Sequence, residues 1–369
     1  MSLADRFASI RNRIVASPRF QSFASAFPLT RWIANRRAEE LFGLCSGFVH
    51  SQILFACVDL DIFQMLRAGP LSVADVAART GLPEEAAERL LKAATALKLL
   101  ARRGDGRYGL AERGAALLGN PSVFAMVRHH QALYADLADP VGLLRNRRTD
   151  TALARFWGYA DAEGRTAVAA GQAGAYSELM AATQAFIAED VLAIAPLAGR
   201  RTLMDLGGGE GAFLAAAARR HPNLQLILCD LPAVAERARA RFAREGLESR
   251  ASAVGLDLFT ETPPPGADAI SLVRVLHDHE DDGAMRFLRA ARAALAPGGV
   301  LIVAEPLAET PGCEAMGDAY FGFYLWAMGS GRPRSAASLT DMLRAAGFSR
   351  VRACGARRPL LTSVLVAGS

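Results

Sequence analysis

An acidic residue and a run of glycines form the motif in this chain with the clearest chemistry. Asp205 ends a short apolar segment. Glycines with the spacing of a ligand loop follow it, before an alanine-rich stretch typical of a helix: Gly207, Gly209 and Gly211. Such a strand–turn–helix lets backbone amides approach a ligand closely. The spacing also fits a dinucleotide loop, but a carboxylate would repel a pyrophosphate and attract an ammonium group. We therefore predict a loop for S-adenosyl-L-methionine (SAM), which has an ammonium group and no phosphate.

Two further acids follow the next predicted strands. Asp230 precedes Leu231 and lies about 20 residues after the glycines, where a carboxylate can bind both hydroxyls of a ribose. Asp257 precedes Leu258, and an acid beside apolar groups could hold an adenine. Each acid alone is more often a helix cap or a loop residue. Three acids at successive strand ends favour one cofactor site.

The candidate catalytic group is His277, which follows the fourth predicted strand at residues 269–275. Ligands of open α/β sheets bind beyond the carboxyl ends of the strands. Methyl transfer to a hydroxyl requires removal of its proton, and a neutral imidazole can take that proton near pH 7. Asp278 comes next, and Glu305, after the neighbouring strand, could orient His277 or stabilise its imidazolium. For each of these side chains a purely structural role is the alternative.

The most aromatic part of the chain is residues 318–328. Two tyrosines, two phenylalanines and a tryptophan fall within residues 320–326. We predict a helix inserted over the site, with a composition that suits a large apolar substrate. A helix of the protein core could have the same composition.

Length and composition set the limits of the prediction. The chain has 369 residues and a net charge of +5, and this length suggests about two domains. Its five cysteines show no spacing typical of metal ligands, so neither a disulfide framework nor a metal site is indicated. No uninterrupted apolar run approaches the roughly 18 residues needed to span a bilayer, and no signal peptide is recognisable. These features predict a cytoplasmic protein, soluble or peripheral to a membrane.

We predict three parts: an arm at residues 1–40, a mostly helical domain at 41–197 and an α/β domain at 198–369. In the arm, seven arginines alternate with aliphatic and aromatic residues. Such a segment could lie at an anionic membrane surface or pack on the chain's own dimer. The apolar segment 41–66 is expected to be buried between helices, across a subunit contact.

The second part contains a winged-helix pattern. Ser72 and Asp75 form a capping box at the start of one helix, and Gly81 ends that helix. Residues 99–110 are typical of a hairpin with an Asp-Gly turn. The fold is common among DNA-binding proteins, but glutamates occupy the first turns of the presumed recognition helix, where phosphate contacts should lie: Glu84, Glu85 and Glu88. We therefore expect no nucleic-acid partner.

The order of these motifs resembles the methyltransferase class that contains plant caffeate and acetylserotonin O-methyltransferases. The matching motifs lie within residues 40–369 and read D-x-G-G-G-x-G, Asp-Leu-Pro, Asp-Leu-Phe, Leu-His-Asp, Pro-Gly-Gly and Ala-Gly-Phe. The resemblance implies a Rossmann-like, seven-stranded SAM methyltransferase domain preceded by a mostly helical winged-helix dimerisation domain. It also implies homodimers that exchange N-terminal segments, and S-adenosylhomocysteine as product.

The resemblance extends to single residues. The catalytic histidine of the class falls on His277, and its first flanking glutamate falls on Glu305. Its second flanking glutamate falls near Pro333, so this chain lacks it, which puts the histidine–glutamate pairing in doubt. Three further residues match cofactor positions of the class: Arg274, Met180 and Thr183.

Within the class, residues 271–276 and 327–332 and the arginine-rich arm are most similar to carotenoid 1-hydroxy O-methyltransferases of purple phototrophic bacteria. This similarity implies methylation of the tertiary 1-hydroxyl of an acyclic carotenoid, of the demethylspheroidene or hydroxyneurosporene type, beside the photosynthetic membrane. A phenolic, quinone or polyketide hydroxyl is the alternative acceptor. A winged-helix DNA-binding regulator and a nicotinamide-dependent oxidoreductase are disfavoured by the acidic helix and by Asp205. The related bacteriochlorophyllide C-methyltransferases are disfavoured by His277.

Overall fold

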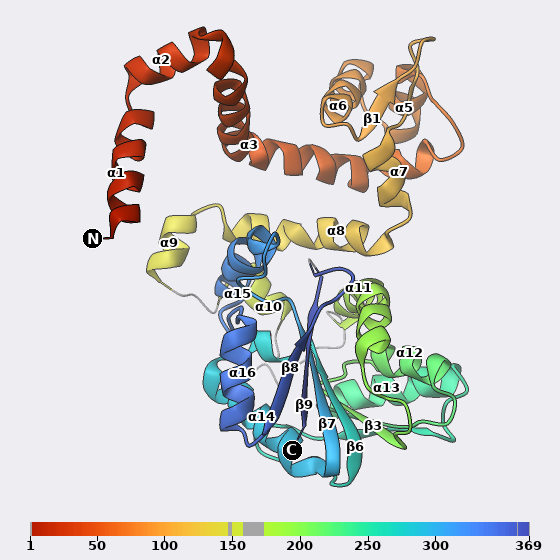
Figure 1. Ribbon diagram of the computed structural model, residues 1–369. Helices are drawn as coiled ribbons and strands as arrows, with labels where there is room; N and C mark the ends of the chain where they lie inside the picture. Colours follow the sequence, from red (N-terminus) through yellow and green to blue (C-terminus); the bar gives the residue numbers. More distant parts are fainter. Residues whose placement is uncertain (1, 147–149, 158–172, 360, 369) are drawn as a thin grey trace. The chain divides into compact units, whose positions relative to one another are not determined.

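The protein is described by a computed structural model that covers residues 2–146, 150–157, 173–359 and 361–368 (Figure 1). It consists of two compact units, Met1–Asn120 and Pro121–Ser369. The helices between residues 121 and 197 therefore group with the C-terminal sheet. The domain boundaries expected after residues 40 and 197 stay predictions.

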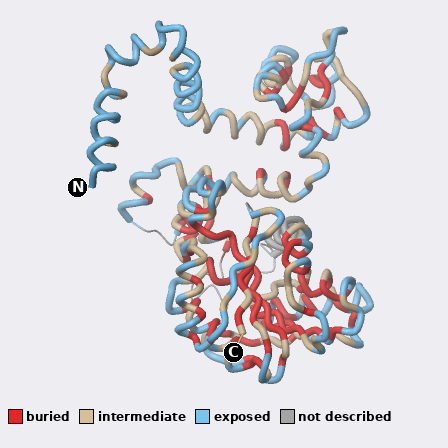
Figure 2. The backbone as a smooth tube through the Cα atoms, in the orientation of Figure 1, coloured by how far each residue is buried: buried red, intermediate tan, exposed pale blue. Residues whose placement is uncertain are grey.

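The first unit begins with three helices, α1 (Leu3–Val15), α2 (Pro18–Ala26) and α3 (Pro28–Asp59). A capping box starts α1: Ser2 accepts a hydrogen bond from the Asp5 amide, and the Asp5 carboxylate accepts one from the Ser2 amide. A proline at the first position starts α2 and α3, because its fixed φ suits a first turn. No described residue of α1 or α2 is buried, and Figure 2 shows this stretch as mostly exposed.

The rest of the first unit confirms the predicted helix–turn–helix and hairpin. Ser72 and Asp75 form the expected capping box, and Gly81 ends the helix with a φ of 74°. The two short strands pair antiparallel. The elements are α4 (Ile62–Met65), α5 (Val73–Thr80), α6 (Glu84–Ala96), β1 (Leu100–Arg102), β2 (Tyr108–Leu110) and α7 (Glu112–Leu118).

Helix α3 is long and apolar on average, although polar residues interrupt its apolar run. Over 18 residues its mean hydropathy is 1.7 with 11% of the residues buried, so by length and composition alone it could cross a membrane. A helix covered by other protein passes the same test. Leu41, Leu44 and Phe48 are 65%, 82% and 73% exposed in the single chain. The subunit contact predicted for residues 41–66 would cover this apolar surface.

The second unit is a seven-stranded sheet with helices on both faces, in the order β5-β4-β3-β6-β7-β9-β8. Strands β3 to β7 run parallel, and β9 runs antiparallel to β7 and β8. This confirms the predicted fold class, and β8 and β9 form an antiparallel pair at the C-terminal end. The strands are β3 (Thr202–Leu206), β4 (Gln225–Asp230), β5 (Ala251–Gly255), β6 (Ala267–Val273), β7 (Leu295–Glu305), β8 (Arg350–Cys354) and β9 (Ser363–Gly368).

Nine α-helices and two single turns are described in this unit besides the strands. Figure 1 shows α11, α12 and α13 beside one face of the sheet, and α14 and α16 beside the other. The helices are α8 (Pro121–Asp136), α9 (Pro140–Arg145), α10 (Ala152–Phe156), α11 (Ala173–Ile194), α12 (Ala212–Arg220), α13 (Pro232–Arg244), α14 (Asp281–Ala294), α15 (Phe321–Met328) and α16 (Ala336–Ala345). A 3₁₀ turn, η1 (Leu276–Asp278), follows β6, and a π-helical turn, η2 (Ala315–Tyr320), leads into α15.

The sheet separates two apolar cores because successive strand residues point to opposite faces. Leu203 packs in the core that contains Phe213 of α12, and its neighbour Met204 packs in the core that contains Phe287 of α14. Buried residues accordingly follow the strands in Figure 2. Because the five parallel strands share a direction, their carboxyl ends meet at one edge of the sheet. That edge carries the candidate site.

Candidate active site

The loop after β3 combines tight packing with one open position. Gly207, Gly209 and Gly211 have φ values of 66°, 58° and 79°, a region that favours glycine. A Cβ on Gly207 would lie 2.9 Å from Val275, and one on Gly211 would lie 2.7 Å from Phe242. A Cβ on Gly209 would meet no atom within 4 Å. The loop is therefore packed at Gly207 and Gly211 and open at Gly209, where a ligand can approach the main chain.

Asp205, at the end of β3, is buried with half of its carboxylate unsatisfied. Its Oδ1 accepts a hydrogen bond of 2.6 Å from the hydroxyl of Ser271, whereas Oδ2 has no partner among the described residues. Burial raises the pKa of Asp205 to about 7, against the Ser271 hydrogen bond and with the nearby charge of Asp230. A buried carboxylate oxygen without a donor suits a ligand that brings a cation or a donor. The site therefore fits the ammonium group of SAM.

Asp230, at the end of β4, connects the glycine loop with the neighbouring strand. Its Oδ2 accepts from the Gly209 amide at 2.8 Å, and its Oδ1 accepts from the Leu231 amide at 2.7 Å. Burial raises its pKa to about 6. Each carboxylate oxygen has a second lone pair, so both can still accept a hydrogen bond from a ribose hydroxyl.

Of the other residues expected at the cofactor, two are described with their side chains in the segment after β5. Asp257 lies in the turn after β5, where its Oδ1 accepts from the Phe259 amide at 2.9 Å. Leu258 belongs to the apolar core on the α14 face. The side chains of Met180 and Thr183 lie outside the described residues, so their expected place at the cofactor stays a prediction.

His277 lies in the 3₁₀ turn after β6 and is held by Glu305 at the end of β7. The Nδ1 atom of His277 and Oε2 of Glu305 form a short hydrogen bond. The other oxygen of Glu305 accepts from the amides of Val275 and Leu276, at 3.0 and 2.7 Å. The two residues are 6% and 2% exposed, so the pair is buried. The absence of the second flanking glutamate thus leaves this pairing intact.

Two more charged groups act on His277. Its Nε2 lies 3.1 Å from Oδ1 of Asp278. Burial alone would lower the pKa of His277, but the charges of Asp278 and Glu305 outweigh it and raise the pKa above its ordinary value. The positive charge of Arg274, a residue with a φ of 59°, opposes this rise. Asp278 and Arg274 therefore belong to the electrostatic environment of the histidine.

The segment that lacks the expected glutamate holds the backbone of the histidine turn. The Arg332 amide donates to the carbonyl of His277 at 3.0 Å, and the Ser330 hydroxyl donates to the carbonyl of Asp278 at 2.9 Å. Gly331, with a φ of 77°, passes so close that a Cβ would lie 2.1 Å from the carbonyl oxygen of His277. This segment therefore holds the turn through hydrogen bonds to its carbonyls and through the close approach of Gly331.

Arg334 is a supporting residue that the sequence reasoning missed. It is 3% exposed, and its guanidinium donates to the carbonyls of Leu276 and His279, at 2.6 and 2.7 Å. It also pairs with Asp281, at 2.8 Å. In the sequence this residue is only an arginine in a Gly-Arg-Pro-Arg loop. Its role depends on the contact between this loop and the histidine turn, which the sequence alone does not indicate.

The aromatic insert lies beside the histidine, as predicted. The ring of Phe321 meets the His277 ring edge-on, with centroids 5.9 Å apart. Tyr320 and Tyr324 meet the Phe321 ring edge-on, with centroids 5.1 and 6.3 Å from it. The loop after β3, the buried histidine and this aromatic group together define a methyltransferase site at the carboxyl edge of a Rossmann-like sheet.

Comparison with known proteins gives the same class. Residues 134–349 match the O-methyltransferase domain, and residues 42–120 match the O-methyltransferase dimerisation domain. The chain therefore belongs to the O-methyltransferase family, and the predicted SAM-dependent O-methyltransferase class is confirmed. The dimerisation domain supports the predicted homodimer.

Individual relatives narrow the comparison. The demethylspheroidene O-methyltransferase of Cereibacter sphaeroides is 45% identical over 96% of this chain and 93% of its own. The demethylspheroidene O-methyltransferase of Rhodobacter capsulatus is 41% identical over 96% of this chain and 88% of its own. The crystal structure of the SAM-dependent methyltransferase SibL superimposes with a TM-score of 0.73 at 26% identity, covering 89% of this chain and 98% of SibL.

The raised pKa of Asp205 predicts how stability depends on pH. Between its unfolded value near 3.8 and its folded value of about 7, the folded protein keeps a proton that the unfolded chain has released. Stability from this group is therefore lost as the pH rises from about 5 to 8, by roughly 2 to 3 kcal/mol. Asp205→Asn should remove this loss in denaturant unfolding measured across that range. Asp341→Asn, on exposed α16, should keep the wild-type profile, and identical profiles for all three proteins would contradict the assignment.

Proposed function

We propose that this enzyme transfers a methyl group from SAM to the tertiary 1-hydroxyl of an acyclic carotenoid. The observation that carries the proposal is the buried His277–Glu305 pair beside the aromatic Phe321, at the same sheet edge as the glycine loop. The two demethylspheroidene O-methyltransferases that match 96% of the chain support the acceptor class. A phenolic, quinone or polyketide hydroxyl remains the alternative acceptor.

The residues of the loop edge would hold the cofactor. The free oxygen of Asp205 would accept the ammonium group, and Asp230 would accept the ribose hydroxyls. Asp257, with Leu258 behind it, is proposed for the adenine, and Arg274, Met180 and Thr183 keep their expected place around it. When bound, SAM supplies an electrophilic methyl group.

The proposed role of His277 is to take the hydroxyl proton of the acceptor. Glu305 accepts a hydrogen bond from Nδ1, which leaves Nε2 as the basic atom and stabilises the imidazolium once the proton has arrived. A tertiary alcohol is far less acidic than a phenol, so its proton leaves late in the transfer. Alignment of the alcohol with the methyl group would then supply most of the rate. The charge of Asp278, whose Oδ1 lies 3.1 Å from Nε2, would stabilise the imidazolium once Nε2 has taken the proton.

The direct test of the acceptor is turnover of the purified dimer with methyl-labelled SAM and 1-hydroxy carotenoids in detergent. We expect label in a carotenoid ether at the tertiary oxygen, and little label in a catechol control. Extraction and chromatography of the products measure both. SAM binding with label only in the catechol or another aromatic acceptor would overturn the carotenoid assignment and keep the cofactor site.

Substitutions at the histidine pair test the base. His277→Ala should lower kcat by about 10²- to 10⁴-fold at saturating SAM, the usual range for a lost general base. Glu305→Gln should have a comparable effect, because an amide facing Nδ1 places the imidazole proton on Nε2 and blocks the basic atom. His221→Gln, at the end of α12 and away from this edge, is the matched control. Near wild-type turnover of His277→Ala would end the general-base assignment.

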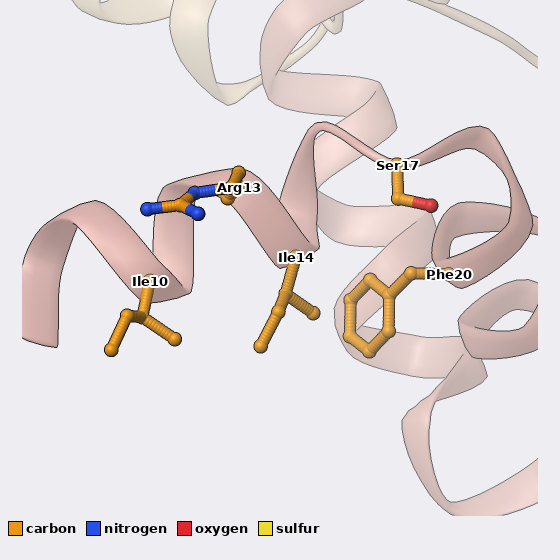
Figure 3. Close-up of a pocket in the computed structure, with 5 residues that line it drawn as sticks. All are labelled: Ile10, Arg13, Ile14, Ser17 and Phe20. Atoms are coloured by element: carbon orange, nitrogen blue, oxygen red, sulfur yellow. The ribbon is translucent and has the colours of Figure 1, made fainter.

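We also propose that the arm contacts an anionic membrane, from which a carotenoid would be taken. The arm precedes the matched dimerisation domain, which begins at residue 42. On α1 and α2 a hollow of about 340 Å³ is lined by apolar residues beside an arginine (Figure 3): Ile10, Arg13, Ile14, Ser17 and Phe20. Phe7 and Phe23 are 67% and 58% exposed nearby. Exposed apolar groups with interspersed arginines favour an anionic interface.

Vesicle binding tests the arm. Replacing Arg11, Arg13 and Arg19 by glutamine should weaken binding to phosphatidylglycerol-containing vesicles by about 100-fold, since each basic residue at such a surface contributes about 1 kcal/mol. Cosedimentation at low and high salt measures the effect. The control carries three matched changes in the second unit, Arg220→Gln, Arg244→Gln and Arg289→Gln. Equal binding by both triple variants would contradict a membrane role for the arm.

A further inference from the structure

Two adjacent histidines of α8 bind two tyrosines of the aromatic insert. Nε2 of His129 lies 2.5 Å from the hydroxyl of Tyr324, and Nε2 of His130 lies 2.8 Å from the hydroxyl of Tyr320. The tyrosines are four residues apart, so they lie one above the other on the helical insert. In Figure 1 the insert, η2 and α15, lies beside α8 and α10 within the second unit.

Each tyrosine hydroxyl has a second partner besides its histidine. The Trp157 indole N–H donates to the Tyr324 hydroxyl at 2.7 Å, and an indole can only donate. The Tyr324 hydroxyl has one proton and two lone pairs, so beside the indole it can still donate to Nε2 of His129 or accept from it. In the other pair the Tyr320 hydroxyl also lies 3.5 Å from the sulfur of Met126, a weak acceptor. The hydroxyls of both tyrosines thus have hydrogen-bond partners. We call Tyr320, Phe321 and Tyr324 the aromatic wall.

The surroundings keep these groups uncharged. Burial lowers the pKa of His129 to about 4, assisted by His130, and burial also lowers the pKa of His130. Burial raises the pKa of Tyr320 and Tyr324 above their ordinary values. A neutral, hydrogen-bonded cluster therefore stands next to Phe321, which contacts the catalytic histidine.

We propose that His129 and His130 determine the acceptor class by holding the tyrosine hydroxyls away from the acceptor. Tyrosine hydroxyls that point to a binding surface hold water and favour polar acceptors. With both hydroxyls bound to the histidines, the wall presents ring carbon to a hydrocarbon chain while the rings keep their positions. The histidines are positioning residues, because they act through the tyrosines. This inference rests on the proposed carotenoid acceptor and adds the residues that select it.

A double-mutant cycle on His130 and Tyr320 tests the proposal. His130→Leu and Tyr320→Phe each leave one polar group without its partner, and that group binds a water that an apolar acceptor must displace. Each single variant should raise the KM for the 1-hydroxy carotenoid by about 10-fold, with kcat and the KM for SAM within about 3-fold of wild type. The double variant removes both polar groups, so its carotenoid KM should return to within about 3-fold of wild type. His130→Gln, which keeps a polar partner for the hydroxyl, should stay near wild type.

Tyr134→Phe is the matched control. Tyr134 lies on the same helix, and its ring is 6.1 Å from that of His130, but its hydroxyl has no hydrogen bond within the described part of the chain. This variant should leave the carotenoid KM unchanged. Additive effects in the cycle, or an equal rise in the KM for SAM, would overturn the proposal by showing a general structural role.

A binding measurement separates this inference from the proposed function. An acyclic polyene hydrocarbon without any hydroxyl can bind but cannot be methylated. Its dissociation constant, measured by quenching of tryptophan fluorescence, reports how well the aromatic wall binds a hydrocarbon chain. If the wild-type protein binds the polyene but methylates no 1-hydroxy carotenoid, the proposed function fails. The proposal about the aromatic wall is still supported in that case if the double-mutant cycle, measured on the dissociation constant of the polyene, is non-additive. If the histidine and tyrosine variants bind the polyene as wild type does, the wall proposal is overturned whatever the enzyme methylates.

Discussion

The carboxylate of Glu305 organises the catalytic edge because one side chain satisfies three donors. Its two oxygens hold the amides of Val275 and Leu276 and the Nδ1 atom of His277. A carboxylate that is 2% exposed is stable only with such partners. The same bonds fix the main chain of the 3₁₀ turn and the ring orientation together, so the position of the imidazole follows from the end of β7.

The loop at residues 330–334 holds the histidine turn through hydrogen bonds to its carbonyls, and not through the second glutamate that the family resemblance implies. A second flanking glutamate is absent near Pro333, and main-chain contacts of Gly331 and Arg332 take up the space against His277. Arg334 then binds the carbonyls on either side of the turn. The histidine is therefore bound at Nδ1 by Glu305, lies close to Asp278 at Nε2, and is fixed through the carbonyls of its turn.

The two sides of the proposed site contrast in how they treat polar atoms. On the side of the glycine loop, Asp205 keeps a buried oxygen without a donor, which suits a cationic ligand. On the side of the insert, the hydroxyls of Tyr320 and Tyr324 are bound to His130 and His129. An unsatisfied carboxylate attracts a charged cofactor, and satisfied hydroxyls leave a surface that suits a hydrocarbon. His277 follows β6, which lies next to β3 in the sheet, and its ring contacts Phe321 of the insert.

The sequence by itself determined the strand ends, the glycine loop and the winged-helix pattern, because these depend on short-range periodicity, turn residues and caps. Asp205, Asp230 and Glu305 could be placed at strand ends for that reason. Only the tertiary structure decided which distant groups meet: His277 and Glu305 are 28 residues apart and pair because β6 and β7 are neighbours. His129 and Tyr324 are 195 residues apart, and no local pattern relates a residue of α8 to one of α15. Such contacts depend on how helices and loops pack on the folded sheet. The hydrogen bonds of Arg334 to the histidine turn and the histidine–tyrosine pairs could therefore be found only in the tertiary structure.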